Sequence, residues 1–123
     1  MPLSLKAFMM LVIFHFYLVR GNFASLYRRV RRYPVSRIPR SKHGIQRICH
    51  AVDLACIWYP KEVLCLQRSA VTVCLLRRYG IPAQMVVGAS LMPFRAHAWV
   101  EADGCVINDK TYVSSMYAIL DRC

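Results

Sequence analysis

The spacing of apolar residues changes once in the second half of the chain, and this change limits the fold class. Apolar residues recur at helical intervals over Ile45–Trp58 and from about Cys65 to Tyr79, and a proline follows each run closely. After residue 82 the period falls to two, which predicts three short strands at 84–89, 95–101 and 105–109. Helices followed by an antiparallel sheet predict an α+β domain.

An apolar run precedes this region. It covers Ala7–Val19, lies between Lys6 and Arg20, and is interrupted only by His15. The run is shorter than the roughly 20 residues that cross a membrane. It has the flanks of a signal peptide, yet its apolar residues cover every face, as in a helix buried against a domain. The pattern by itself leaves both alternatives open.

Positive charge is concentrated at the N-terminal end. The first 52 residues hold ten Lys and Arg and no acid, whereas residues 53–123 hold seven and all six acids. Pro34 and Pro39 argue against a long helix over Arg28–Lys42, so we expect a solvated basic linker that attracts polyanions. The predicted organisation is an apolar helix and basic arm over 1–43, followed by one domain over 44–123.

Six cysteines occur singly, with no C-x-x-C pair, and this spacing argues against a metal site. With 57% hydrophobic residues the chain can build its own core, so a disulfide framework is the less favoured interpretation. Cys65 would open the second predicted helix, where backbone N–H groups and the helix dipole favour a thiolate. Cys74, nine residues on, would lie on the opposite face of the helix and pack in the core.

His97 is the candidate base for Cys65. Alternation over 95–101 places it on the same strand face as Trp99. The group that orients its ring depends on the following hairpin. A two-residue loop at Asp103-Gly104 puts Asn108 on the His97 face, and a loop one residue longer puts Asp109 directly opposite. Both loops suit an Asp-Gly pair, so both alternatives remain.

These residues carry a family resemblance. Cys65, the words LLRRYGIPAQMVVG at 75–88 and HAWVE at 97–101, and Asn108-Asp109 resemble the transglutaminase-like cysteine protease family, over roughly residues 45–121. The similarity is closest to the stand-alone leader peptidases of lasso-peptide biosynthesis. It implies a papain-like core and a thiol protease that cleaves the leader from a ribosomally made precursor. By motif match, Cys65 would be the nucleophile, His97 the general base and acid, and Asp109 the orienting carboxylate.

The resemblance also implies the surroundings of the reaction. It calls for no cofactor, and it names as partners the precursor peptide, a separate leader-recognition protein and the macrolactam-forming cyclase; nucleic acid is not expected. The family is cytoplasmic, which favours a buried or membrane-apposed first helix over a cleaved signal peptide. The backbone N–H of Cys65 would stabilise the oxyanion, with Tyr59 or Gln67 as second donor and Trp99 as a wall of the cleft.

Two other functions stay open. The same Cys-His-Asp set would serve acyl transfer to an amine, as in true transglutaminases. From a different class, the chain could be a basic module that binds nucleic acid or an anionic membrane, with Cys65 and His97 only packing. Arg68 and Ser69, one turn beyond Cys65, would either contact substrate or cover the helix.

Overall fold

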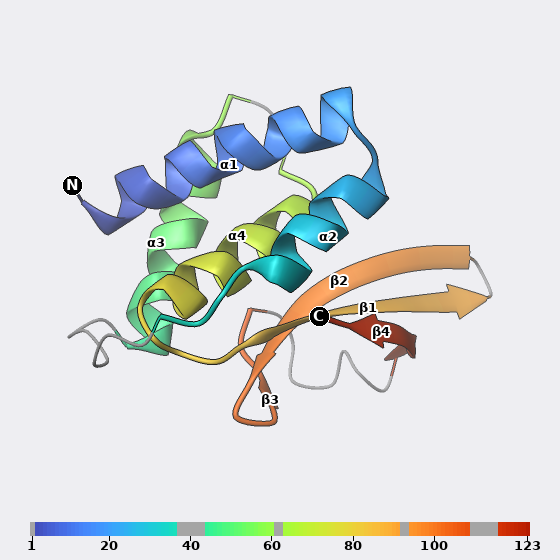
Figure 1. Cartoon of the computed structure of the whole chain (residues 1–123). Coiled ribbons are helices and arrows are strands. Elements are labelled where there is room, and N and C mark those ends of the chain that lie inside the picture. Colours follow the sequence, from blue (N-terminus) through green and yellow to red (C-terminus); the bar gives the residue numbers. More distant parts are fainter. Residues whose placement is uncertain (1, 37–43, 61–62, 92–93, 109–115) are drawn as a thin grey trace.

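The computed structural model describes residues 2–36, 44–60, 63–91, 94–108 and 116–123, and within them it confirms the α+β prediction. The described helices all come before the described strands along the chain (Figure 1). The described elements are α1 (Leu3–Arg20), α2 (Phe23–Arg32), α3 (Ile45–Trp58), α4 (Cys65–Arg78), β1 (Gln84–Leu91), β2 (Phe94–Ala102), β3 (Cys105–Val106) and β4 (Ala118–Arg122).

Helices α3 and α4 begin where the periodicity predicts. The bounds of α3 are the predicted ones, and α4 ends one residue earlier than expected. Gly80 adopts a φ of 80°, a left-handed conformation that glycine reaches without steric cost. The N–H of Ile81 then donates to the Leu76 carbonyl at 2.9 Å, which closes the helix end.

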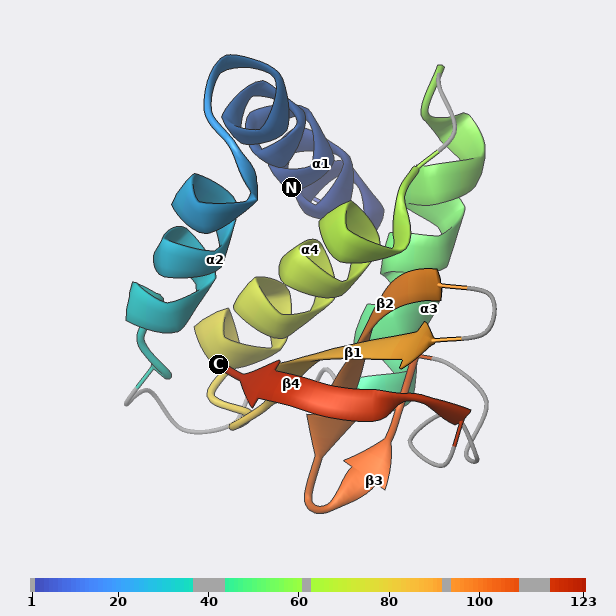
Figure 2. The ribbon, with the colours of Figure 1, turned by 90° about the vertical axis from the view of Figure 1, so that its right-hand side faces the viewer.

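The sheet is antiparallel in the order β3-β2-β1-β4. Strands β1 and β2 pair from Gln84↔Glu101 to Leu91↔Phe94. β4 was not predicted, because its five residues are all exposed and show no alternation. It pairs with the outer side of β1, and Met85 and Cys123 exchange two backbone hydrogen bonds of 2.9 Å just beyond it. The chain end therefore forms one edge of the sheet (Figure 2).

The β2–β3 turn decides between the two hairpin loops. Ala102 pairs with Cys105, and both loop residues have positive φ, 53° at Asp103 and 76° at Gly104. These angles are those of a two-residue turn that matches the twist of antiparallel strands. The longer loop was the wrong alternative. Strand β3 is also shorter than predicted, and Asp109 lies outside the described residues.

Helix α4 lies at the centre of the fold, between the sheet and the other helices (Figures 1 and 2). Ten of its fourteen residues are buried. Helix α1 packs on α3 and α4 through Ala7, Leu11 and Phe14, which are at most 3% exposed. The apolar run is thus part of the core on one face. α1 is also the one helix in the described part of the chain that is long and apolar enough to cross a membrane.

The linker expected over Arg28–Lys42 was wrong for its first five residues, which belong to α2. Asn22 caps this helix, accepting a hydrogen bond of 3.0 Å from the Ser25 N–H. Leu26 and Val30 are fully buried in the common core, while the arginines between and beyond them are exposed. The apolar pair spaced by four residues outweighs the local charge density, because burial of one face stabilises a short helix.

Candidate functional site

Cys65 is the first residue of α4 and is half-buried. Leu64 precedes it in an extended conformation, and no side chain caps this helix start among the described residues. The N–H groups of the first turn of a helix have no partner within the helix, and they carry the positive end of its dipole. The thiol therefore lies where a negative charge is stabilised by backbone groups.

His97 lies near the middle of β2, held between aromatic rings. Its ring stacks on Tyr117 at 5.2 Å between centroids and on Trp99 at 6.0 Å. Trp99 is fully buried, and its indole N–H donates to Glu101 at 3.0 Å. A Cβ at Gly88, the cross-strand partner of His97, would come within 2.9 Å of the Trp99 ring and of the Tyr117 Cβ. Glycine at this position thus allows the aromatic support of His97.

Cys65 and His97 line one cavity of about 280 Å³. It forms where the start of α4 meets β2 and the segment after β3, and its remaining lining residues are Val63, Arg68, Ser69, Ala98 and Asn108. The structure therefore brings together the thiol and the imidazole singled out in the sequence. The third predicted residue, Asp109, lies outside the described residues.

Asn108 links the sheet to α4 beside the cavity. Its Oδ1 accepts a hydrogen bond of 2.7 Å from the Val100 N–H, and its Nδ2 donates to Ser69 Oγ at 3.2 Å. Ser69 Oγ in turn donates to the Ala98 carbonyl at 3.1 Å. These bonds hold the strand of His97 at a set position relative to the helix of Cys65. Asn108 lines the cavity, and there it ties the two elements together.

An ion pair also borders the cavity. Arg68 on α4 donates to the carboxylate of Asp53 on α3. The two side chains are 39% and 48% exposed, so solvent screens the pair and its contribution to stability is small. Its geometric effect is to hold a guanidinium beside the cavity. The sequence offered no signal for this contact, because the two residues belong to different helices.

Two of the predicted cleft residues lie elsewhere. Gln67 is buried, and its Nε2 donates to the Leu11 carbonyl on α1 at 2.7 Å. Tyr59 packs its ring against Phe8 at 5.6 Å. Neither lines the cavity of Cys65. Trp99 is placed behind His97 rather than in the cavity wall, so it contributes by fixing the imidazole.

Four other thiols are poor nucleophiles. Burial raises the pKa of Cys49 to about 11 and that of Cys74 to about 12. Burial also raises the pKa of Cys56 and of Cys123. The thiolate is the reactive form, and an apolar environment disfavours it. These four residues are therefore unsuited to nucleophilic attack at neutral pH.

This difference predicts a labelling pattern. Native protein treated with iodoacetamide at pH 8 should be alkylated at Cys65 and at the exposed Cys105 well before Cys49 and Cys74. With a pKa of about 11, Cys49 is thiolate in roughly one molecule per thousand at that pH. Peptide mapping by mass spectrometry at timed intervals measures the order. Alkylation of Cys74 as fast as Cys65 would contradict it.

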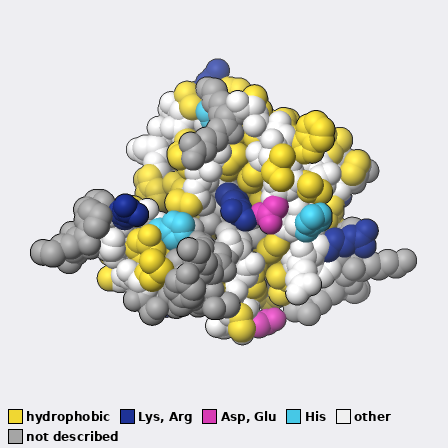
Figure 3. Space-filling model, turned by 180° about the vertical axis from the view of Figure 1, so that it is seen from behind, with side chains coloured by type: hydrophobic (Ala, Val, Ile, Leu, Met, Phe, Trp, Pro, Cys, Tyr) yellow, Lys and Arg dark blue, Asp and Glu magenta, His cyan; other side chains and the backbone are white. Residues whose placement is uncertain are grey.

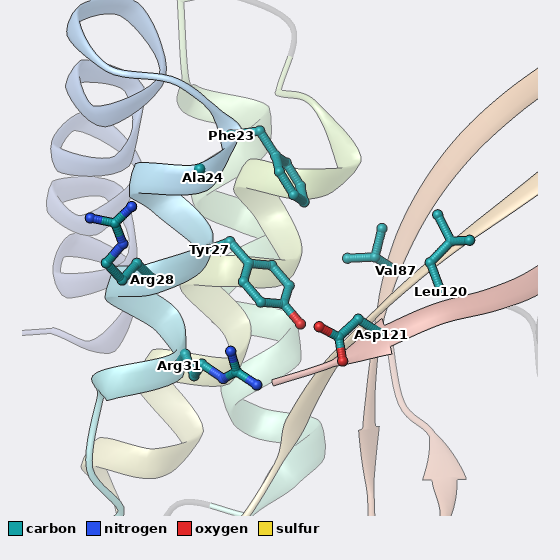
Figure 4. Close-up of a pocket in the computed structure, with 8 residues that line it drawn as sticks. All are labelled: Phe23, Ala24, Tyr27, Arg28, Arg31, Val87, Leu120 and Asp121. Atoms are coloured by element: carbon teal, nitrogen blue, oxygen red, sulfur yellow. The ribbon is translucent and has the colours of Figure 1, made fainter.

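A larger cavity, of about 420 Å³, lies between α2 and the β1–β4 edge of the sheet (Figure 4). Its lining consists of Phe23, Ala24, Tyr27, Arg28, Arg31, Val87, Leu120 and Asp121. The Tyr27 hydroxyl points toward the Asp121 carboxylate and lowers the pKa of that acid. This lining holds no cysteine or histidine, so the smaller cavity is the one suited to nucleophilic chemistry. Among the described residues, no three His, Cys, Asp or Glu side chains are grouped to hold a metal.

Comparison with known proteins gives one family. A protein-family model described as the transglutaminase-like superfamily matches residues 8–121. The match begins well before residue 45, where the resemblance in the sequence starts, and it includes α2 and most of α1. In the same comparisons, no curated protein and no solved structure matches the chain.

Proposed function

Because the chain belongs to the transglutaminase-like superfamily, we propose that it is a cysteine peptidase that removes the leader from a ribosomally made lasso-peptide precursor. The family implies a cysteine-dependent hydrolase or transferase. The observation that carries the proposal is the shared cavity of Cys65, at the start of α4, and His97, on β2. We choose a leader peptide as substrate because the sequence motifs around these two residues resemble those of the leader peptidases.

The proposed reaction proceeds through an acyl-enzyme. His97 accepts the thiol proton as the Cys65 sulfur attacks the scissile carbonyl, and the C–N bond breaks as His97 passes this proton to the departing amine. Water then attacks the thioester while His97 accepts its proton, and that proton returns to the sulfur as the C–S bond breaks. The backbone N–H of Cys65 is the first donor to each oxyanion, because it lies at the helix start that carries the thiol. Asp109 is proposed as the carboxylate that orients the imidazole, by motif match.

The nearest rival is transfer of the acyl group to an amine. Both reactions share the first step, and only the acceptor that attacks the thioester differs. We favour water, since the resemblance is to peptidases. The proposed partners are the precursor peptide, a separate leader-recognition protein and the cyclase that would use the released core.

The test is mass spectrometry of a leader-containing precursor incubated with this protein and a separate leader-recognition protein in H₂¹⁸O. Cleavage at one leader–core junction, with ¹⁸O in the new leader carboxylate, would support the peptidase. A product that carries an added amine and no ¹⁸O would support the transferase instead. Unchanged precursor with every recognition protein tried, together with salt-sensitive binding to polyanions, would favour the basic binding module.

Alanine substitutions at Asn108 and Asp109 should have different effects, the first mainly on stability and the second mainly on catalysis. Replacing Asn108 with alanine leaves the buried Val100 N–H without its acceptor, and we expect the free energy of unfolding to fall by about 1–3 kcal/mol. Replacing Asp109 with alanine is expected to lower kcat/KM by about 10²-fold or more while the melting temperature changes little. Thermal unfolding and cleavage rates measure the two effects. If the Asn108 variant alone lost activity at unchanged stability, Asn108 would be the orienting residue.

A further inference from the structure

The outward face of α1 carries no polar side chain over four turns. Leu5, Met9, Ile13, Phe16 and Val19 are 44–66% exposed and lie within one stripe of the helix. A helix on the surface of a protein in water normally presents charged or polar residues on this side. α1 therefore exposes a continuous apolar face to solvent.

The end of α3 extends this face. Trp58 is 78% exposed, and it lines a hollow of about 160 Å³ together with Ala55 of α3 and with Ser4, Leu5 and Phe8 of α1. Figure 3 shows hydrophobic side chains gathered over the upper part of the molecule, where α1 and α3 lie. We call Leu5, Met9, Ile13, Phe16, Val19 and Trp58 together the α1–α3 apolar face. Exposed apolar patches of this kind mark surfaces that bind a partner, a ligand or a membrane.

The surroundings of this face are basic. The chain contains no acidic residue before Asp53, so α1 and α2 carry only positive charges. Arg20 ends the stripe, with its guanidinium over the Phe16 ring at 5.7 Å. The exposed arginines of α2 begin eight residues later, at Arg28. These positive charges would therefore attract a negatively charged surface to the apolar face.

We propose that the α1–α3 apolar face docks on the surface of an anionic lipid bilayer, with α1 lying in the plane of the interface. A protein interface carries about one hydrogen bond per 100–200 Å², and the side chains of this face offer almost none. Acyl chains require no hydrogen bonds, and they accept an apolar stripe without shape complementarity. Trp58 and Arg20 are of the types that gather at headgroup depth, where an apolar body and a polar tip are both accommodated.

The opposite face of α1 argues against a spanning helix. Ala7 and Leu11 are fully buried in the core, and Phe14 is 3% exposed. The carbonyl of Leu11 also accepts the hydrogen bond from the buried Gln67 side chain. To cross a bilayer, α1 would have to leave these contacts and expose the core of α4 to water. A helix that lies on the membrane keeps them all.

The two tryptophans make a direct test. Trp58 belongs to the proposed membrane face, and Trp99 is fully buried, so only Trp58 would respond to lipid. The full chain is mixed with vesicles of phosphatidylcholine and phosphatidylglycerol that carry brominated acyl chains, and with vesicles of phosphatidylcholine alone. We expect a blue shift and quenching with the anionic vesicles, weakened by salt. The response should vanish in Trp58→Phe.

Two matched variants locate the surface. Ile13→Glu places a charge on the α1–α3 apolar face, and Leu120→Glu places one on β4, at an exposed apolar position outside that face. We expect Ile13→Glu to lower vesicle partitioning at least about tenfold and Leu120→Glu to leave it unchanged. Circular dichroism and the melting temperature check that both variants fold.

Three results would overturn the proposal. One is equal partitioning of both glutamate variants. Another is the absence of any Trp58 response to anionic vesicles, with concentration-dependent self-association that Ile13→Glu abolishes; the face would then bind a second copy of this chain. The third is vesicle-bound protein that resists extraction by high salt and alkaline carbonate, which would indicate insertion. None of these results depends on whether the cavity cleaves peptides.

Discussion

The proposed leader cleavage is expected to fall by about four orders of magnitude or more when Cys65 is replaced by alanine. The acyl-enzyme cannot form without the thiol, and enzymes that lose their nucleophile retain only the small rate provided by binding and oxyanion contacts. Cys65 is half-buried, so the substitution should change the melting temperature little. The measurement is kcat/KM for a precursor peptide. Enzyme is present in large excess over the peptide, and mass spectrometry follows the cleavage at timed intervals.

Cys105→Ala is the matched control, because this thiol is exposed on β3 and does not line the cavity. It should cleave at the rate of the unchanged protein. His97→Gln should lose about 10²–10⁴-fold, the contribution typical of general acid–base catalysis. Persistent turnover in the Cys65 variant at more than about one percent of the normal rate would remove Cys65 from the nucleophile role.

A large loss of stability is expected when Arg77 is replaced by methionine. Arg77 is 7% exposed and has no carboxylate partner among the described residues. Its Nε and Nη2 donate to the Ala83 carbonyl at 3.0 and 2.9 Å. Its Nη1 donates to the Val30 carbonyl at 2.6 Å and to that of Tyr33 at 3.2 Å. One guanidinium thus joins the end of α2, α4 and the approach to β1.

Methionine has a similar reach but offers no donor, so these carbonyls would lose their shared partner. We expect the free energy of unfolding to fall by about 3–5 kcal/mol, measured by urea denaturation. Arg78→Met is the matched control, since Arg78 is the next residue and is exposed; it should change stability by less than about 0.5 kcal/mol. Arg77→Lys should recover only part of the loss, because one ammonium cannot reach all three carbonyls. A loss below about 1 kcal/mol in the methionine variant would show that water replaces the guanidinium.

Local patterns predicted the elements that position the chemistry. Helix α4 starts at Cys65 because a run of apolar residues at helical spacing starts there, and Gly80 ends it. Alternation over β2 predicted a side of the strand for His97 and Trp99. These features depend on short-range sterics and on which face of the helix or strand is buried, so the sequence pattern predicts them. The hairpin loop could not be predicted, because Asp103-Gly104 suits a loop of either two or three residues.

What the sequence alone determined is the order of helices and strands, the helix start at Cys65 and the strand of His97. Only the tertiary structure decided that both residues line one cavity, that Gln67 bonds to α1 instead, and that Arg28–Arg32 form a helix. It also decided which face of α1 remains exposed. The reason is physical: an all-apolar helix has no preferred inside, so its orientation is set by α3 and α4, which are distant in sequence and pack against it.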